Sequence, residues 1–241
     1  MATYNMVSEL RQASRKAPSE RAIWYRLHGA RRDGIVEMVR KGVYLPADLG
    51  NKFVIGCNAV ENGVVAYHSA LEYHLLQTQE FNELYVSADK SFRPFEYMGE
   101  RYSYKKLKFI HKPISETVDG LQIRVTSVSQ TLIDCIYNIN LAGGIEELMY
   151  ALAEVGPQLV VEKELIYCLR QYNKKSLWQR AGLLFSIFNA RIGLSSKFFD
   201  LCRSEMGKNI SYLINPYYCD SFNSDWNICI PRDLTSQIKA S

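Results

Sequence analysis

Four side chains suited to nucleic-acid contacts recur at helical spacing near the start of this 241-residue chain. They occupy positions i, i+4, i+7 and i+11, on one face of a helix, and are Arg21, Tyr25, His28 and Arg32. Such side chains supply short-range donors for phosphates and base edges. The pattern therefore indicates a recognition helix for the major groove of DNA.

The sequence also supplies the start of this helix and a face on which it can pack. Ser19 can cap the helix and the acidic Glu20 suits its first turn, which predicts a helix reaching residue 28 or 32. A separate apolar face is formed by Ile23, Leu27 and Ala30. One face can thus pack while the other meets a ligand.

A β-hairpin with a basic tip is predicted directly after the helix. Residues 35–39 and 43–45 form its strands, and a tight turn holds Arg40 and Lys41. The tip would place both cations on the phosphate backbone or in the minor groove, with Tyr44 as a further wing contact. A helix followed by such a hairpin is typical of a winged helix–turn–helix. The alternative is an ordinary α–β–β packing unit with solvated arginines.

The excess positive charge lies in the first fifth of the chain. Residues 1–50 hold nine Lys/Arg and five Asp/Glu, whereas the remaining 191 residues hold twenty of each. A basic module attached to a neutral body favours a polyanion-binding head. A full winged helix has two helices before the recognition helix, and only residues 7–13 can supply one, so we expect a shortened module.

Beyond the hairpin, strands followed by a run of helices predict an α+β fold rather than a doubly wound sheet. The predicted strands are 64–67, 84–88, the hairpin 116–118 and 121–125 around Asp119-Gly120, and the tail strands 210–214 and 226–230. The predicted helices are about 48–62, 68–76, 129–139, 145–152, 161–169 and 177–188. We divide the chain into a winged helix, 1–47, and a mixed α/β domain with a helical C-terminal half, 48–241.

The sequence gives no sign of an enzyme, a cofactor or a metal. It contains no nucleophile elbow, phosphate-binding loop, dinucleotide fingerprint or zinc-protease motif. His68 and His74 are six residues apart and do not align as a metal pair. Glu146 and Glu147 suit the dipole of a helix start. A metal-dependent nuclease is the weaker alternative, because no clustered acids with a lysine stand out.

The chain is expected to be cytoplasmic and free of the membrane. It shows neither a signal-peptide core nor an apolar stretch long enough to cross a bilayer. Its six cysteines form no C-x-x-C pair, so we expect reduced thiols rather than zinc ligands or disulfides.

Several strings resemble the AbiEi family in order and spacing along about residues 20–230. They are RKGVYLP at 40–46, VVAYHSALEYHLL at 64–76, TLIDCIYNINLAGGIEELMYALA at 131–153 and RAGLL at 180–184. The 131–153 string is the most specific of them. The chain departs from the family at its short N-terminal region.

The resemblance implies a winged helix joined to an antitoxin domain in a phage-defence, type IV toxin–antitoxin module. Such a protein represses its own promoter by binding inverted repeats in double-stranded DNA, where two copies could associate. It also counteracts an AbiEii-type nucleotidyltransferase toxin without a stable complex. Two other functions remain open: a plain repressor without an antitoxin role, and a protein-interaction module with a degenerate winged helix.

Overall fold

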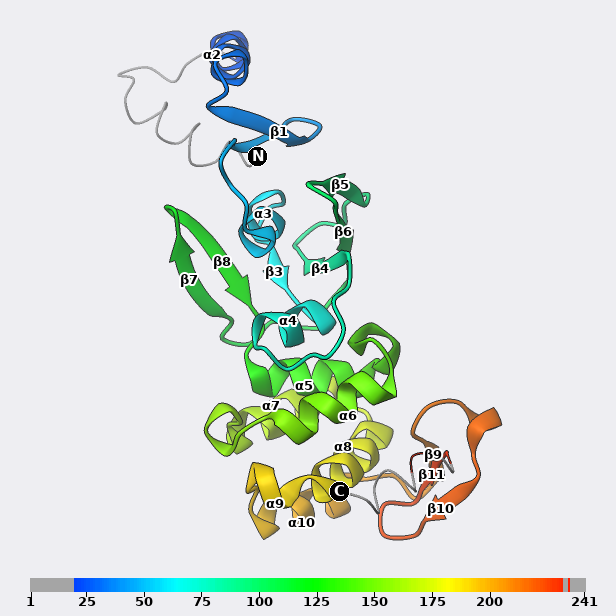
Figure 1. Cartoon of the computed structure of the whole chain (residues 1–241). Coiled ribbons are helices and arrows are strands. Elements are labelled where there is room, and N and C mark those ends of the chain that lie inside the picture. The colour runs from blue at the N-terminus through cyan, green and yellow to red at the C-terminus, as the bar shows by residue number, and fades with distance from the viewer. Residues whose placement is uncertain (1–19, 232–233, 235–241) are drawn as a thin grey trace. The chain divides into compact units, whose positions relative to one another are not determined.

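The computed structural model describes residues 20–231 and residue 234 as a mixed α+β fold (Figure 1), which confirms the predicted fold class. The chain forms two compact units that interleave along the sequence. The N-terminal unit comprises residues up to 69, 81–107 and 112–126, and the C-terminal unit comprises 70–80, 108–111 and 127 onwards. The predicted boundary at residue 47 falls inside the N-terminal unit and stays a prediction about the smaller helix–hairpin module.

The first described elements form that module: helix α2 (Glu20–Arg32) followed by strands β1 (Val36–Arg40) and β2 (Val43–Pro46). The two strands are antiparallel. The predicted helix is therefore confirmed, and it extends to Arg32. The predicted cap at Ser19 and the helix predicted over 7–13 lie outside the described residues.

The hairpin differs from the prediction by one residue. Ile35 is exposed and lies outside the strand, whereas Arg40 belongs to β1 and pairs with Val43. The ladder shifts register between Met38 and Arg40. Such a bulge breaks the alternation of strand faces, so Val39 is buried and the turn shrinks to Lys41-Gly42.

A six-stranded mixed sheet forms the core of the N-terminal unit, in the order β5-β6-β4-β3-β8-β7. Its strands are β3 (Val64–Val65), β4 (Glu83–Ser87), β5 (Phe95–Tyr97), β6 (Glu100–Tyr104), β7 (Ile114–Val118) and β8 (Leu121–Val125). Helix α3 (Lys52–Asn58) packs on it, where Gly56 lets the helix approach Leu84 and Val86. The helix predicted over 48–62 is too long, because Asn51 caps α3 by accepting hydrogen bonds from the Phe53 and Val54 amides.

Helices dominate the C-terminal unit, as predicted. They are α5 (Val128–Tyr137), α6 (Ile145–Glu154), α7 (Glu162–Tyr172), α8 (Lys175–Ile187), α9 (Asn189–Ile192) and α10 (Ser196–Glu205), while α4 (His68–Tyr73) begins in the other unit. A small sheet, β10-β11-β9, contains β9 (Ser211–Tyr212), β10 (Ser221–Asn223) and β11 (Ile228–Ile230). Helix α10 and strand β10 were not predicted.

The cysteines divide into two groups. Four are buried free thiols, as expected: Cys57, Cys135, Cys168 and Cys202. Cys219 and Cys229 form a disulfide, with Cα atoms 5.3 Å apart, so the expectation of reduced thiols is wrong for this pair. No local sequence pattern pointed to this pairing, because the two residues meet only when β10 pairs with β11. Among the described residues, no helix combines the length and apolarity that a membrane crossing requires.

Candidate nucleic-acid interface

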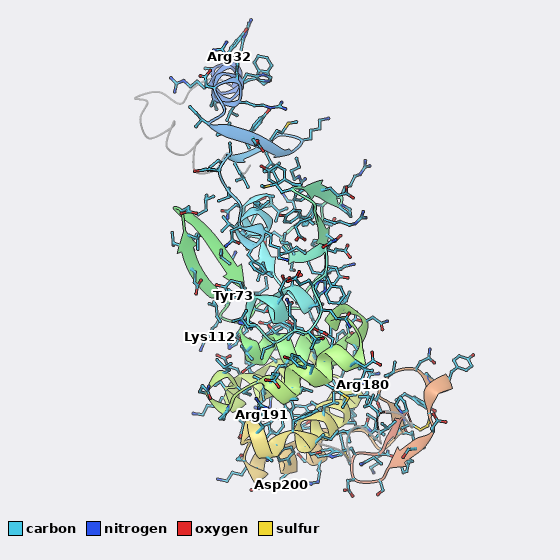
Figure 2. All side chains as sticks on the ribbon, viewed as in Figure 1. Arg32, Tyr73, Lys112, Arg180, Arg191 and Asp200 are labelled. Atoms are coloured by element: carbon cyan, nitrogen blue, oxygen red, sulfur yellow. A yellow bond between two sulfur atoms is a disulfide. The ribbon has the colours of Figure 1, made fainter. Side chains whose placement is uncertain are left out.

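Helix α2 presents the four predicted contact residues to solvent. They lie on one face of the helix, and all four are exposed: Arg21, Tyr25, His28 and Arg32. Leu27 is buried, and Ile23 and Ala30 are half-buried, which confirms the packing face. Figure 2 shows the Arg32 side chain at α2, with 83% of its surface accessible.

Trp24 joins this face and was missed from the sequence. Its ring is 54% exposed, and its centroid lies 4.0 Å from that of His28 and 5.2 Å from that of Tyr25. The Arg21 guanidinium lies 5.8 Å from the Tyr25 ring centroid. Trp24 precedes His28 by four residues, and that spacing was the available signal. A large exposed tryptophan among cations suits stacking or edge contacts with nucleic acid.

The arginines of α2 are largely free of acidic partners. Arg26 and Arg31 are also exposed. Within residues 21–231, no carboxylate pairs with Arg21, Arg26 or Arg31. Arg32 pairs with Asp33 at 3.4 Å, and both side chains are largely exposed. An exposed pair of this kind contributes little to stability and can be replaced by a phosphate contact.

The two cations predicted at the hairpin tip meet different surroundings. Lys41 is exposed at the turn, whereas Arg40 is half-buried. The Arg40 guanidinium lies 5.5 Å from the ring centroids of both Phe92 and Phe95. This is cation–π geometry against aromatic rings of the β4–β5 loop and β5. Tyr44, the third predicted wing residue, is half-buried and pairs across the hairpin with Met38.

A hydrogen bond provides a second contact between the hairpin and β5. The Tyr97 hydroxyl donates to the Glu37 carboxylate at 2.6 Å. Burial, followed by this bond to a negative group, raises the pKa of Tyr97 to about 12. The hydroxyl therefore stays a donor across the physiological range. The cation–π contacts and this hydrogen bond together fix the hairpin against β5.

The neighbouring His68 and Ser69 have structural partners. A His68 ring nitrogen lies 2.8 Å from the Glu83 carbonyl oxygen, and the ring packs against Phe81 and Tyr85. The Ser69 hydroxyl accepts a hydrogen bond from the Tyr85 amide at 2.8 Å. Both residues thereby tie the start of α4 to β4.

Two carboxylates, Glu147 and Asp134, are held in the core of the C-terminal unit. Glu147 is buried and accepts hydrogen bonds from the Thr78 amide and hydroxyl at 2.6 and 2.5 Å. Asp134 is buried and accepts from the Tyr172 hydroxyl at 2.6 Å. Glu146 is exposed. In the part of the chain that the structure describes, no three His, Cys, Asp or Glu side chains gather as a metal site.

Comparison with known proteins gives a likeness in fold. No protein-family model matches the chain, and no curated protein matches it either. The chain is similar to a solved structure, the crystal structure of the RV2827C protein from Mycobacterium tuberculosis, with a TM-score of 0.60 and 11% sequence identity. The match covers 100% of this chain and 95% of that one. At this identity, the likeness shows that the two chains share a fold along their length.

Proposed function

We propose that this protein is a DNA-binding transcriptional repressor of its own promoter. The observation that carries the proposal is the exposed face of α2, where Trp24 and His28 lie among exposed arginines. Three of these, Arg21, Arg26 and Arg31, pair with no carboxylate of residues 21–231. Exposed cations without an acidic partner can neutralise DNA phosphates and release the counterions condensed on the DNA, which favours binding. Buried or paired cations offer no such surface. An anchored hairpin with Lys41 at its turn follows the helix directly.

In this proposal α2 enters the major groove and the hairpin contacts the flanking backbone. The helix has 13 residues and is therefore about 20 Å long, enough to lie along a groove about 12 Å wide. Arg21, His28 and Arg32 would contact base edges and phosphates. Lys41 and Tyr44 of the hairpin would contact the phosphate backbone or the minor groove. Two copies would bind the two halves of an inverted repeat.

The resemblance to the AbiEi family adds a second part to the proposal, an antitoxin role in a cytoplasmic phage-defence module. Two of the resembling strings, 131–153 and 180–184, lie in the segment from α5 to α6 and in α8, and most of their aliphatic residues are buried in the core of the C-terminal unit. Because these residues are buried, the resemblance supports a shared type of domain and does not indicate which surface carries the antitoxin role. The protein would oppose an AbiEii-type nucleotidyltransferase toxin without binding it stably, and the proposal includes no catalytic activity, cofactor or metal.

The DNA-binding part is tested by separating Arg40 from Lys41. Full-length wild type, Lys41→Ala and Arg40→Ala are titrated against the DNA upstream of the gene, and their melting temperatures are measured. Lys41 is exposed, so Lys41→Ala should weaken binding about tenfold, as expected for one lost contact of about 1.4 kcal/mol, with an unchanged melting temperature. Arg40→Ala should lower both the affinity for DNA and the melting temperature, because it also removes the contacts with Phe92 and Phe95.

Equal affinity of Lys41→Ala and wild type would remove the hairpin turn from the proposed interface.

The antitoxin part has a separate test. Where a nucleotidyltransferase gene lies beside the gene of this protein, that gene is induced in cells with and without this protein, and rescue of growth is expected. Rescue by a chain with Arg21→Ala and Arg32→Ala would show that antitoxicity does not need the α2 surface. A failure to rescue would leave a plain repressor.

A further inference from the structure

We propose that the DNA-contacting surface continues from the hairpin onto the loop between β4 and β5, residues 88–94, through Lys90 and Arg93. The inference rests on the proposed DNA-binding function and names a second segment of the chain that binds the duplex. It extends that function to a loop about fifty residues away in the sequence, outside the helix–hairpin module.

The loop is joined to the hairpin at its turn. Arg40 immediately precedes Lys41, and its guanidinium lies 5.5 Å from the Phe92 ring centroid. Phe92 immediately precedes Arg93. The contact between Arg40 and Phe92 joins the hairpin to the loop, and Lys41 and Arg93 are the residues that follow these two in the sequence. In this proposal, one duplex would contact both cations.

The aromatic residues of the loop are held against the sheet. The Phe92 ring centroid lies 5.8 Å from that of Tyr104, and the Phe95 ring stacks on Tyr102 at 4.8 Å. Pro94, between the two phenylalanines, fixes its own backbone φ angle. With its aromatic side chains turned to the sheet, the loop leaves Lys90 and Arg93 exposed.

The charges of the loop also favour a phosphate partner. Its acidic residue, Asp89, accepts a hydrogen bond from the Asn62 side-chain amide at 2.6 Å. No carboxylate of residues 21–231 pairs with Lys90 or Arg93. The two cations are therefore available for a polyanion, and together with Lys41 they would track one stretch of backbone.

The salt dependence of binding measures this contact. Full-length wild type, Lys90→Ala/Arg93→Ala and the control Lys163→Ala/Arg170→Ala are titrated at several salt concentrations. The probes are two duplexes, the upstream DNA and a scrambled sequence. The control removes the same charges from exposed positions of α7 in the C-terminal unit. Each lost phosphate contact lowers the slope of log K against log salt by about 0.9, so the loop variant should lose about 2.

We expect the loop variant to weaken binding to both duplexes by about tenfold or more at low salt, because phosphate contacts are independent of sequence. The control should bind as wild type does, and circular dichroism should match for all three proteins. A loop variant with the affinity and slope of the control would overturn this inference. If Arg21→Ala/Arg32→Ala still abolished binding in that case, the proposed function would stand without the extension. If the wild type bound neither duplex, both would fall.

Discussion

Two neighbouring cations, Arg40 and Lys41, have different roles because their surroundings differ. Lys41 is exposed at the hairpin turn, whereas Arg40 lies over two aromatic rings. Sequence alone grouped the two as equal DNA contacts, because both were placed in the predicted turn before Gly42. The distinction depends on Phe92 and Phe95, which lie more than fifty residues further along the chain. Predicted contact residues on α2 needed no such distant partner, and their exposure could be predicted from helical spacing.

Asp134 is the residue whose ionisation should most affect stability. Its carboxyl is buried, and Oδ2 has no hydrogen-bond partner in the described structure. Burial raises the pKa of Asp134 from 3.8 to about 7, against the opposing hydrogen bonds of Tyr172 and Gln130. Between these two pKa values the folded chain keeps a proton that the unfolded chain has lost. Stability should therefore fall as pH rises from about 4 to 7, and then level off.

Asp134→Asn removes this titration while keeping the shape of the side chain. The free energy of unfolding of the variant, relative to wild type, should rise with pH, by roughly 4 kcal/mol at most between pH 4 and 8. Urea denaturation at several pH values measures the difference. The exposed Asp48→Asn serves as a charge-matched control. A constant difference between Asp134→Asn and wild type across this range would contradict the assignment of a raised pKa to Asp134.

Among the elements, those with strong local signals were predicted and those that depend on distant partners were not. The hairpin β7–β8 was predicted from Asp119-Gly120, which both adopt positive φ angles, 51° and 76°. Helix α10 was missed although Ser195 caps it through the Phe198 amide. Its apolar residues were too few to give a clear helical pattern. The hydrogen bond from Thr78 to Glu147 links residues 69 apart and leaves no local signature in the sequence.

The packing of α8 depends on Gly182. A Cβ atom at Gly182 would overlap the ring of Trp226, whose side chain is buried, whereas a Cβ at Gly29 of α2 would meet nothing within 4 Å. Gly182→Ala should therefore lower the free energy of unfolding by about 1–3 kcal/mol through overpacking. Gly29→Ala should raise it by about 0.5–1 kcal/mol, because alanine favours the helix.

Chemical denaturation of the two glycine variants provides the measurement, and the same change of side chain at both sites makes each a control for the other. Equal stability of Gly182→Ala and wild type would mean that Trp226 does not occupy the surface of α8. A loss of stability in Gly29→Ala would mean that α2 packs against a further part of the molecule at that position.

At the scale of the whole molecule, sequence patterns predicted the order of strands and helices and so the α+β class. They could not predict the two interleaved units, because a single boundary along the chain cannot describe segments that return to an earlier unit. The contact of Glu37 with Tyr97, 60 residues apart, belongs to the same class of features. The shared fold with the RV2827C protein at 11% identity shows that this arrangement tolerates nearly complete replacement of the sequence.

Salt-dependent binding of the full-length protein to the DNA upstream of its gene tests the central claim most directly. Wild type and Arg21→Ala/Arg32→Ala are compared at low and moderate salt, with scrambled DNA as the control. We expect the wild type to bind the upstream DNA specifically, with an affinity that falls steeply as salt rises. The variant should lose affinity, and its slope of log K against log salt should fall by about 0.9 for each lost phosphate contact. Absence of wild-type binding at low salt, or equal binding by the variant, would contradict it.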